Sequence, residues 1–325
     1  MIRDLRKNLI RSFSLCIMTA LLLLMAVVFP AAIFAASQEP AQRVFTSPEE
    51  ARQALIDAVR AKDHAALKAI FGTAAGELEP GDPVEQANEF EHFARHVEEG
   101  VGLVKEGDAK AVLIIGEKKW PFPIPVVKKE AGWLFDTIAG REEILNRRIG
   151  HNEMLAIKVC RAYAEAQREY YDMTDPYGDQ IPKYAQHMIS RPGKKNGLYW
   201  ETAPGEKESP LGILVAGAKE EGYMQPHKAG ESGPHPFHGY YFRILKKQGP
   251  NAPGGKFNYV INGNMVAGFA LIAYPARWGV SGVMTFIINQ RGRVYQKNLG
   301  PKTAGIARRM MQYNPDLTWK LVAEQ

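Results

Sequence analysis

Runs of hydrophobic residues separated by Gly, Pro and Asn are most regular between residues 238 and 300. The runs are rich in β-branched and aromatic residues, which is typical of strands, and the residues between them are typical of turns. Residues 290–292 make a short polar connection between two runs, which predicts a tight hairpin. The pattern therefore predicts four antiparallel strands, at residues 239–245, 268–274, 281–289 and 293–297.

A helical period replaces the strand pattern at residues 152–171, where hydrophobic residues recur at steps of three and four. This spacing predicts a long helix whose apolar face packs on the downstream sheet. Gly140 and Gly150 bracket a charged stretch, which predicts a separate linker helix at residues 141–149. We place a domain boundary near Gly150 for the same reason.

The N-terminal region begins with a helix-start signal, in which Ser47 precedes Pro48 and Glu50 lies three residues after the serine. A helix is expected from this point, with further helices at residues 65–71 and 84–99 and strands at residues 111–115, 123–128 and 132–136. The expected fold class is α+β. N-terminal helices with a small antiparallel sheet are followed by a long helix packed on a four-stranded antiparallel sheet with long loops.

Residues 172–236 are polar and rich in turn-forming residues. Two short helices are expected there, near residues 181–189 and 211–221, and a terminal helix is expected later at residues 301–312. Long irregular segments inside compact domains are uncommon and are often functional. We therefore expect any site where these loops meet His238 and Tyr274.

The first residues form a basic stretch followed by an apolar run and small residues, which is the layout of a secretory signal peptide. The expected organisation is a signal peptide at 1–35, a leader at 36–45, a first α+β domain at 46–149 and a second at 150–325. The apolar run of roughly 20 residues could also anchor the chain in a membrane if it stayed uncleaved. The expected location is periplasmic or secreted.

Cleavage after Ala35 would lower the formal net charge from +6 to +3, because four basic and one acidic residue are removed. So small a balance over some 290 residues gives no reason to expect nucleic acid as a partner. Cys160 would then be the one cysteine left, so no internal disulfide is expected. Its helical setting predicts a buried, inert thiol.

Histidines supply two weak metal candidates. His92 and His96 stand four residues apart on a predicted helix, but Phe93 occupies the position where a zinc metalloprotease has glutamate. A second group, His227, His235 and His238, lies in the loop before the sheet. Solvent-exposed histidines explain both groups better, so neither a metal nor another cofactor is expected.

Aromatic residues near the long loops are the better candidates for binding. A groove lined by several of them would suit a peptide or a glycan. No residue is assigned a catalytic role, because Ser281 lacks the glycine spacing of a hydrolase nucleophile and is followed by a strand. The predicted binding residues are His238, Tyr240, Tyr274, Trp278 and Trp200.

Short motifs lie at residues 147–150, 166–170, 237–243, 273–276 and 299–300. With these motifs, the chain from about residue 45 to the C-terminus resembles the bacterial family catalogued as domain of unknown function 2950. This resemblance implies an exported protein of uncharacterised role. Residues 46–140 are similar to cone-shaped nuclear-transport-factor-like and cystatin-like domains, which enclose an apolar cavity. The C-terminal half is similar to type IV pilin-like heads, although it lacks a prepilin cleavage site.

Two functions follow as hypotheses. The first is a non-catalytic exported envelope protein that binds an envelope protein, a peptide or a glycan, and that touches a membrane only through an uncleaved N-terminal segment. The alternative is an envelope hydrolase with a site at the domain junction. Its residues would be Glu153, His238, Arg243 and Tyr274. Hydrogen bonds among these groups in an open cleft would favour the enzyme.

Overall fold

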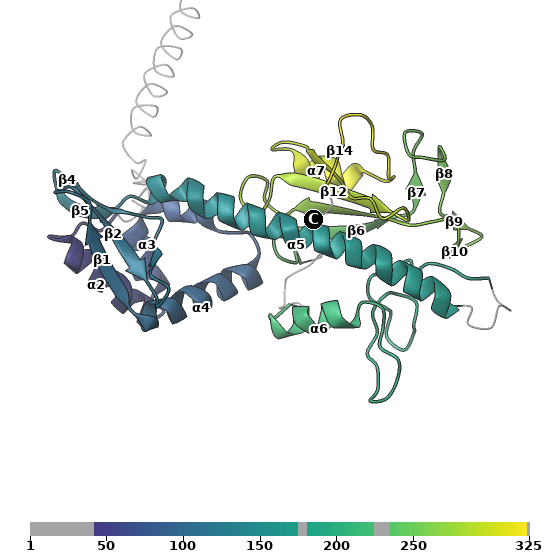
Figure 1. Ribbon diagram of the computed structural model, residues 1–325, viewed down its shortest axis with the longest axis horizontal. Helices are drawn as coiled ribbons and strands as arrows, with labels where there is room; N and C mark the ends of the chain where they lie inside the picture. The colour runs from purple at the N-terminus through teal and green to yellow at the C-terminus, as the bar shows by residue number, and fades with distance from the viewer. Residues whose placement is uncertain (1–41, 175–180, 224–234, 324–325) are drawn as a thin grey trace, which may run out of the picture. The chain divides into compact units, whose positions relative to one another are not determined.

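The computed structural model of the protein describes residues 42–174, 181–223 and 235–323 (Figure 1). The predicted signal peptide, most of the predicted leader, and His227 lie outside these residues. Over the described ranges, no helix combines the length and the apolar character needed to cross a membrane.

The N-terminal helices begin where capping residues predict. Helix α2 (Pro48–Arg60) starts after Ser47, whose hydroxyl accepts a hydrogen bond from the backbone N–H of Glu50. Asp63 caps α3 (His64–Phe71) in the same way, and a short 3-10 helix (Thr73–Leu78) leads to α4 (Pro83–Glu99).

An antiparallel sheet follows these helices in the order β1-β2-β4-β5, with β3 paired to β2. The strands are β1 (Val101–Lys105), β2 (Lys110–Ile115), β3 (Trp120–Pro121), β4 (Val126–Lys129) and β5 (Gly132–Phe135). Leu55, Ile70, Leu113 and Phe135 are among the buried residues that join the helices to this sheet in one core. Sequence reasoning found β2, β4 and β5 but missed β1 and β3.

Helix α5 (Thr137–Thr174) runs without a break through Gly150, so the expected division into a linker helix and a separate long helix is wrong. The two glycines have different settings in this helix. A Cβ atom on Gly140 would lie 2.6 Å from the carbonyl oxygen of Pro123, whereas a Cβ on Gly150 would meet nothing within 4 Å. Gly140 is thus required by close packing, and Gly150 is tolerated because one glycine lowers helix stability by only about 1 kcal/mol.

These settings predict opposite effects for one substitution. Gly150→Ala should raise the free energy of unfolding by about 0.5–1 kcal/mol, because alanine favours the helix and has room there. Gly140→Ala should lower it by about 1–3 kcal/mol, because the methyl group clashes with backbone. Urea denaturation of the two variants checks both signs. A destabilised Gly150→Ala protein would contradict a continuous α5.

The C-terminal sheet has the strand order β14-β13-β12-β11-β6 and is antiparallel throughout. Its strands are β6 (Tyr240–Leu245), β11 (Ala270–Pro275), β12 (Met284–Asn289), β13 (Tyr295–Asn298) and β14 (Lys320–Leu321). The predicted strands and the hairpin at 290–292 are confirmed, and β14 extends the sheet. Two small hairpins pair β7 (Lys247–Gln248) with β8 (Phe257–Asn258) and β9 (Val260–Ile261) with β10 (Asn264–Met265).

Helix α5 contacts β11 and β12, as expected for a long helix on an antiparallel sheet, and α7 (Thr303–Arg309) also contacts β11. Every residue of β11 is consequently buried. The α+β fold class is confirmed. Cys160 lies in this core with no exposed surface, and burial raises the pKa of its thiol to about 12.

Two local predictions are corrected. Residues 181–189 form no helix, because the fully buried side chain of Gln167 bonds both the N–H and the carbonyl of Ala185. The terminal helix ends at Arg309 and does not continue to residue 312. At its end, the Arg243 guanidinium donates hydrogen bonds to the carbonyl oxygens of Ala307 and Met310. The predicted helix near 211–221 is confirmed as α6 (Gly212–Glu220).

Candidate functional site

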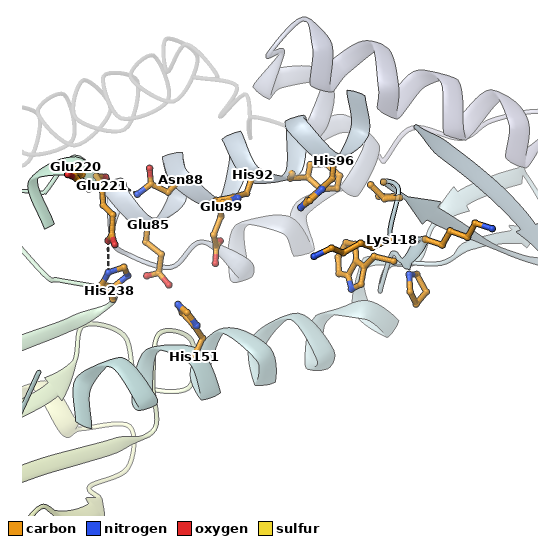
Figure 2. Close-up of a pocket in the computed structure, with 16 residues that line it drawn as sticks. Glu85, Asn88, Glu89, His92, His96, Lys118, His151, Glu220, Glu221 and His238 are labelled. Atoms are coloured by element: carbon orange, nitrogen blue, oxygen red, sulfur yellow. Dashed lines mark hydrogen bonds and ion pairs between the residues drawn. The ribbon is translucent and has the colours of Figure 1, made fainter. Parts of the chain in front are cut away.

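A cleft of about 1000 Å³ lies between α4 and α5 (Figure 2). One of its ends is formed by the C-terminal end of α6 and by His238, and the other by the turn between β2 and β3. The lining residues are Glu85, Asn88, Glu89, His92, Phe93, His96, Ile115, Gly116, Lys118, Lys119, Trp120, Pro121, His151, Glu220, Glu221 and His238.

Asp82 fixes the first end of the cleft. Its Oδ1 atom accepts hydrogen bonds from the backbone N–H groups of Val84 and Glu85 and so caps α4. Its Oδ2 atom accepts from the Tyr223 hydroxyl at 3.1 Å and from the Gly239 N–H at 3.0 Å. The carboxylate, which is 1% exposed, therefore holds the start of α4 against the segment that enters β6.

His238 occupies this end in a left-handed backbone conformation, with a φ of 45°. Its Nε2 atom lies 2.7 Å from Oε2 of Glu221, and its backbone N–H donates to the Tyr223 hydroxyl (Figure 2). Burial lowers the pKa of His238, although the Glu221 carboxylate acts in the opposite direction. The imidazole is thus held in a defined position by Glu221, which follows the end of α6.

Glu85 is the most perturbed carboxyl group of the cleft. Its side chain is 7% exposed, and its Oε1 atom accepts a hydrogen bond of 2.7 Å from Nδ2 of Asn152. Its Oε2 atom is buried without a hydrogen-bond partner in the described structure. Burial raises the pKa of Glu85 to about 7, and the nearby Glu89 carboxylate adds to the rise. The carboxyl group points toward the cleft in Figure 2 and can gain or lose a proton near neutral pH.

The middle of the cleft combines a fixed ion pair with exposed imidazoles. Arg148 of α5 holds both carboxylate oxygens of Glu89, at 2.8 and 2.7 Å. His151 points from α5 into the cleft, and His92 lines it from α4 (Figure 2). The pair ties α4 to α5, while the two histidines remain open to a ligand.

The other end of the cleft is apolar and basic. Phe93 and Trp120 provide hydrophobic surface, and Lys118 and Lys119 are both exposed. Neither lysine has an ion pair with any residue that the structure describes. The cleft is therefore acidic at one end and basic at the other.

No group of three or more histidine, cysteine, aspartate or glutamate residues within the described ranges is arranged to hold a metal ion. His96 bonds Glu99 through Nδ1 at 3.1 Å, while His92 faces the cleft. His235 is exposed, and His227 falls outside the described residues.

Of the predicted binding residues, His238 lines the cleft and the others lie elsewhere. Tyr240 is 1% exposed and donates its hydroxyl to the Met284 carbonyl. Tyr274 packs against Tyr241, and Trp200 packs near Tyr170. Trp278 donates to Asn298. The structure does not bring these aromatic residues together in one groove.

The residues named for the alternative enzyme are also separated. Glu153 accepts the backbone N–H groups of Val283 and Met284 at the start of β12. Arg243 binds carbonyl groups at the end of α7. The Ser281 hydroxyl is fully buried, donates to the Gly239 carbonyl and accepts from the Arg277 N–H. These contacts hold the scaffold in place, and none of these three residues is among those that line the cleft.

Sequence reasoning missed Asp82, Glu85, His151 and Glu221. Asp82 before Pro83 is a helix-cap signal that could have located the start of α4. Nothing in the local pattern around Glu85 indicates burial, because its neighbours Gln86 and Ala87 are exposed. Glu85 is buried by Asn152 of α5 and by Gly239, the residue before β6.

Comparison with known proteins places the chain in a family. No curated protein and no solved structure matches it, so the resemblances to cone-shaped domains and pilin-like heads are not confirmed. A family model described as "Protein of unknown function (DUF2950)" matches residues 42–322, which include both sheets and every residue of the cleft. The chain therefore belongs to the DUF2950 family, as its motifs indicated.

Proposed function

We propose that this protein is an exported envelope protein that binds a ligand without transforming it, and that the ligand occupies the cleft between α4 and α5. The observation that carries the proposal is Glu85, whose Oε2 atom is buried beside the cleft and has no hydrogen-bond partner among the described residues. A buried polar atom without a hydrogen bond lowers stability by about 1–3 kcal/mol. A ligand that donates a hydrogen bond to Glu85 would recover that free energy.

Export is supported by the basic, apolar and small-residue order of residues 1–35. The expected result of fractionating cells that express the full chain is recovery outside the cytoplasm. N-terminal sequencing should then begin near Ala36. Recovery of an intact chain from the cytoplasm, beginning at Met1, would contradict this part of the proposal.

Binding is favoured over catalysis because the cleft lacks an activated nucleophile among the described residues. Cys160 is fully buried with a raised pKa, and the Ser281 hydroxyl is engaged on both sides. Binding needs only the shape of the cleft, its apolar end and its hydrogen-bonding end, and the described residues supply all three.

One observation favours an enzyme as the second candidate. A carboxyl group with a pKa of about 7 suits general acid–base catalysis at neutral pH, and Glu85 has such a pKa in the same cleft as His238. An enzyme of this kind would use Glu85 to move a proton at the substrate and a water molecule as the nucleophile. Conversion of a bound probe would favour this candidate over pure binding.

The binding proposal predicts that removing imidazoles from the cleft weakens binding without unfolding the protein. His92 and His151 are exposed on helices, so the double variant His92→Ala/His151→Ala should fold normally. We expect it to bind at least about tenfold more weakly than the wild type in calorimetry against short-peptide and oligosaccharide mixtures. Mass spectrometry should recover the bound probe unchanged.

Lys158→Ala is the matched control, since Lys158 is exposed on α5 but does not line the cleft. It should bind like the wild type. Equal binding by the double variant would move the binding site away from this cleft. An altered probe would replace the binding proposal by the enzyme.

A further inference from the structure

Opposite charges separate along the length of the cleft. Glu85, Glu220 and Glu221 lie at the end near His238, whereas Lys118 lies at the far end near His96 (Figure 2). Three of the carboxylates in or beside the cleft already have partners, because Glu89 binds Arg148, Glu99 binds His96 and Glu221 binds His238. The lysines at the far end have no ion-pair partner in the described structure. The charges without an ion-pair partner among the described residues are thus Glu85 and Glu220 at one end and Lys118 and Lys119 at the other.

Helix α4 gives the distance between these ends. Glu85 and His96 are eleven positions apart in this helix, which corresponds to about 16 Å along its axis at 1.5 Å per residue. The turn that carries Lys118 lies next to His96, since a Cβ on Gly116 would be 3.4 Å from Nδ1 of that histidine. An extended peptide covers about 16–18 Å with five residues.

From this arrangement we propose that the ligand is a short, extended peptide of about five residues with both termini free. Its N-terminal ammonium group binds Glu85, and its C-terminal carboxylate binds Lys118 and Lys119. The inference rests on the proposed binding function and specifies the ligand class and its direction in the cleft.

The acidic end suits an ammonium group because it offers acceptors and a negative charge. Among the described residues, one oxygen of the Glu85 carboxyl group has no hydrogen-bond partner and Glu220 has no ion pair. An ammonium group carries three N–H donors and can bond to several carboxylate oxygens at once. Glu221 is already bonded to His238, so it holds the imidazole at the edge of this end.

The basic end suits the last residue of the peptide because it combines charge with hydrophobic surface. Phe93 and Trp120 line this end with the two lysines, and Trp120 also packs against Phe122. An apolar C-terminal side chain would contact these rings while its carboxylate meets the lysines. The imidazoles of His92 and His151 lie between the two ends, where peptide N–H and carbonyl groups would pass.

The test uses a library of pentapeptides with randomised positions and an apolar last residue, prepared with free ends, with an acetylated N-terminus, and with an amidated C-terminus. Native mass spectrometry measures binding of each form to the full mature chain. Acetylation should weaken binding about tenfold or more, because it removes the ammonium charge. Glu85→Gln should weaken binding of the free peptides to the same degree, and acetylation should then add little.

Lys118→Ala/Lys119→Ala should act in the same way at the other terminus, so that amidation adds little in that variant. Lys158→Ala should leave all values unchanged. Circular dichroism and urea denaturation confirm that each variant is folded.

The outcomes separate this inference from the proposed function. Equal binding of free and acetylated peptides would overturn the inferred direction and the role of Glu85. If the protein bound oligosaccharides but no peptide, and if His92→Ala/His151→Ala abolished that binding, the peptide inference would be wrong. The proposed binding function would still stand. Failure of both probe classes to bind would overturn both.

Discussion

Replacing Glu85 by glutamine should make the protein more stable at pH 8, by up to about 3 kcal/mol, and leave its stability at pH 5 nearly unchanged. Burial raises the pKa of Glu85 in the folded state from 4.5 to about 7. Between pH 4.5 and about pH 7 the folded state therefore binds more protons than the unfolded state, so the free energy of unfolding falls as pH rises. A pKa rise of this size lowers the free energy of unfolding by about 3 kcal/mol above pH 7.

Glutamine is the suitable replacement because it keeps the volume of glutamate and an oxygen that can accept the Asn152 hydrogen bond. It has no charge to lose or gain, so the part of the pH dependence of stability that comes from residue 85 should disappear. Urea denaturation of both proteins at pH 5, 6, 7 and 8 measures the expected divergence. The difference should grow through this range and level off near pH 8.

Glu220→Gln is the matched control, because Glu220 lines the same cleft but is exposed. Its stability curve should run parallel to that of the wild type. If the stability of Glu85→Gln also varied with pH as that of the wild type does, Glu85 would ionise like an ordinary surface carboxyl group. Its burial would then have no energetic effect. The explanation of Glu85 as a destabilising group kept for binding would then fail.

Together, these expectations describe a conflict between stability and binding at one residue. The substitution that stabilises the free protein at pH 8 is the same one that should weaken peptide binding. Binding sites often lower stability in this way, because groups prepared for a ligand are poorly satisfied without it. Ammonium binding would also favour the charged form of Glu85, so peptide binding near neutral pH should release protons.

Local sequence signals predicted much of the scaffold. The strands of the C-terminal sheet follow from β-branched runs between turns, and the start of α2 follows from Ser47 and Pro48. The continuity of α5 did not follow, because a glycine ends some helices and is tolerated inside others. The absence of a helix at 181–189 depends on Gln167, which lies in a different element.

The cleft was harder to predict because its residues come from distant segments. His238 was identified from its place at the entry to β6, but its partner Glu221 belongs to the end of α6. Asp82 reaches Gly239 across 157 positions of sequence. Local periodicity shows which face of a helix is apolar but does not show which distant polar groups meet there, so Glu85 gave no signal.

The second large effect is expected at Asp82, where alanine should lower the free energy of unfolding by about 3 kcal/mol. The substitution leaves the backbone N–H groups of Val84, Glu85 and Gly239 and the Tyr223 hydroxyl without their acceptor. Loss of a helix cap accounts for about 1 kcal/mol, and the buried donors that lose a charged acceptor account for the remainder. Urea denaturation measures the total effect.

Asp63→Ala is the matched control, because Asp63 caps α3 at an exposed position through a single bond to Ala66. Its effect should be about 1 kcal/mol. The loss of stability in Asp82→Asn should lie between those of Asp82→Ala and Asp63→Ala. The asparagine keeps one oxygen for the helix cap, but its amide N–H group would face the Gly239 N–H. Hydrogen exchange should show faster opening at Gly239 in both Asp82 variants.

If Asp82→Ala lowered the free energy of unfolding no more than Asp63→Ala does, other contacts would hold α4 and the entry to β6 together. His238 would then keep its position in the cleft without Asp82.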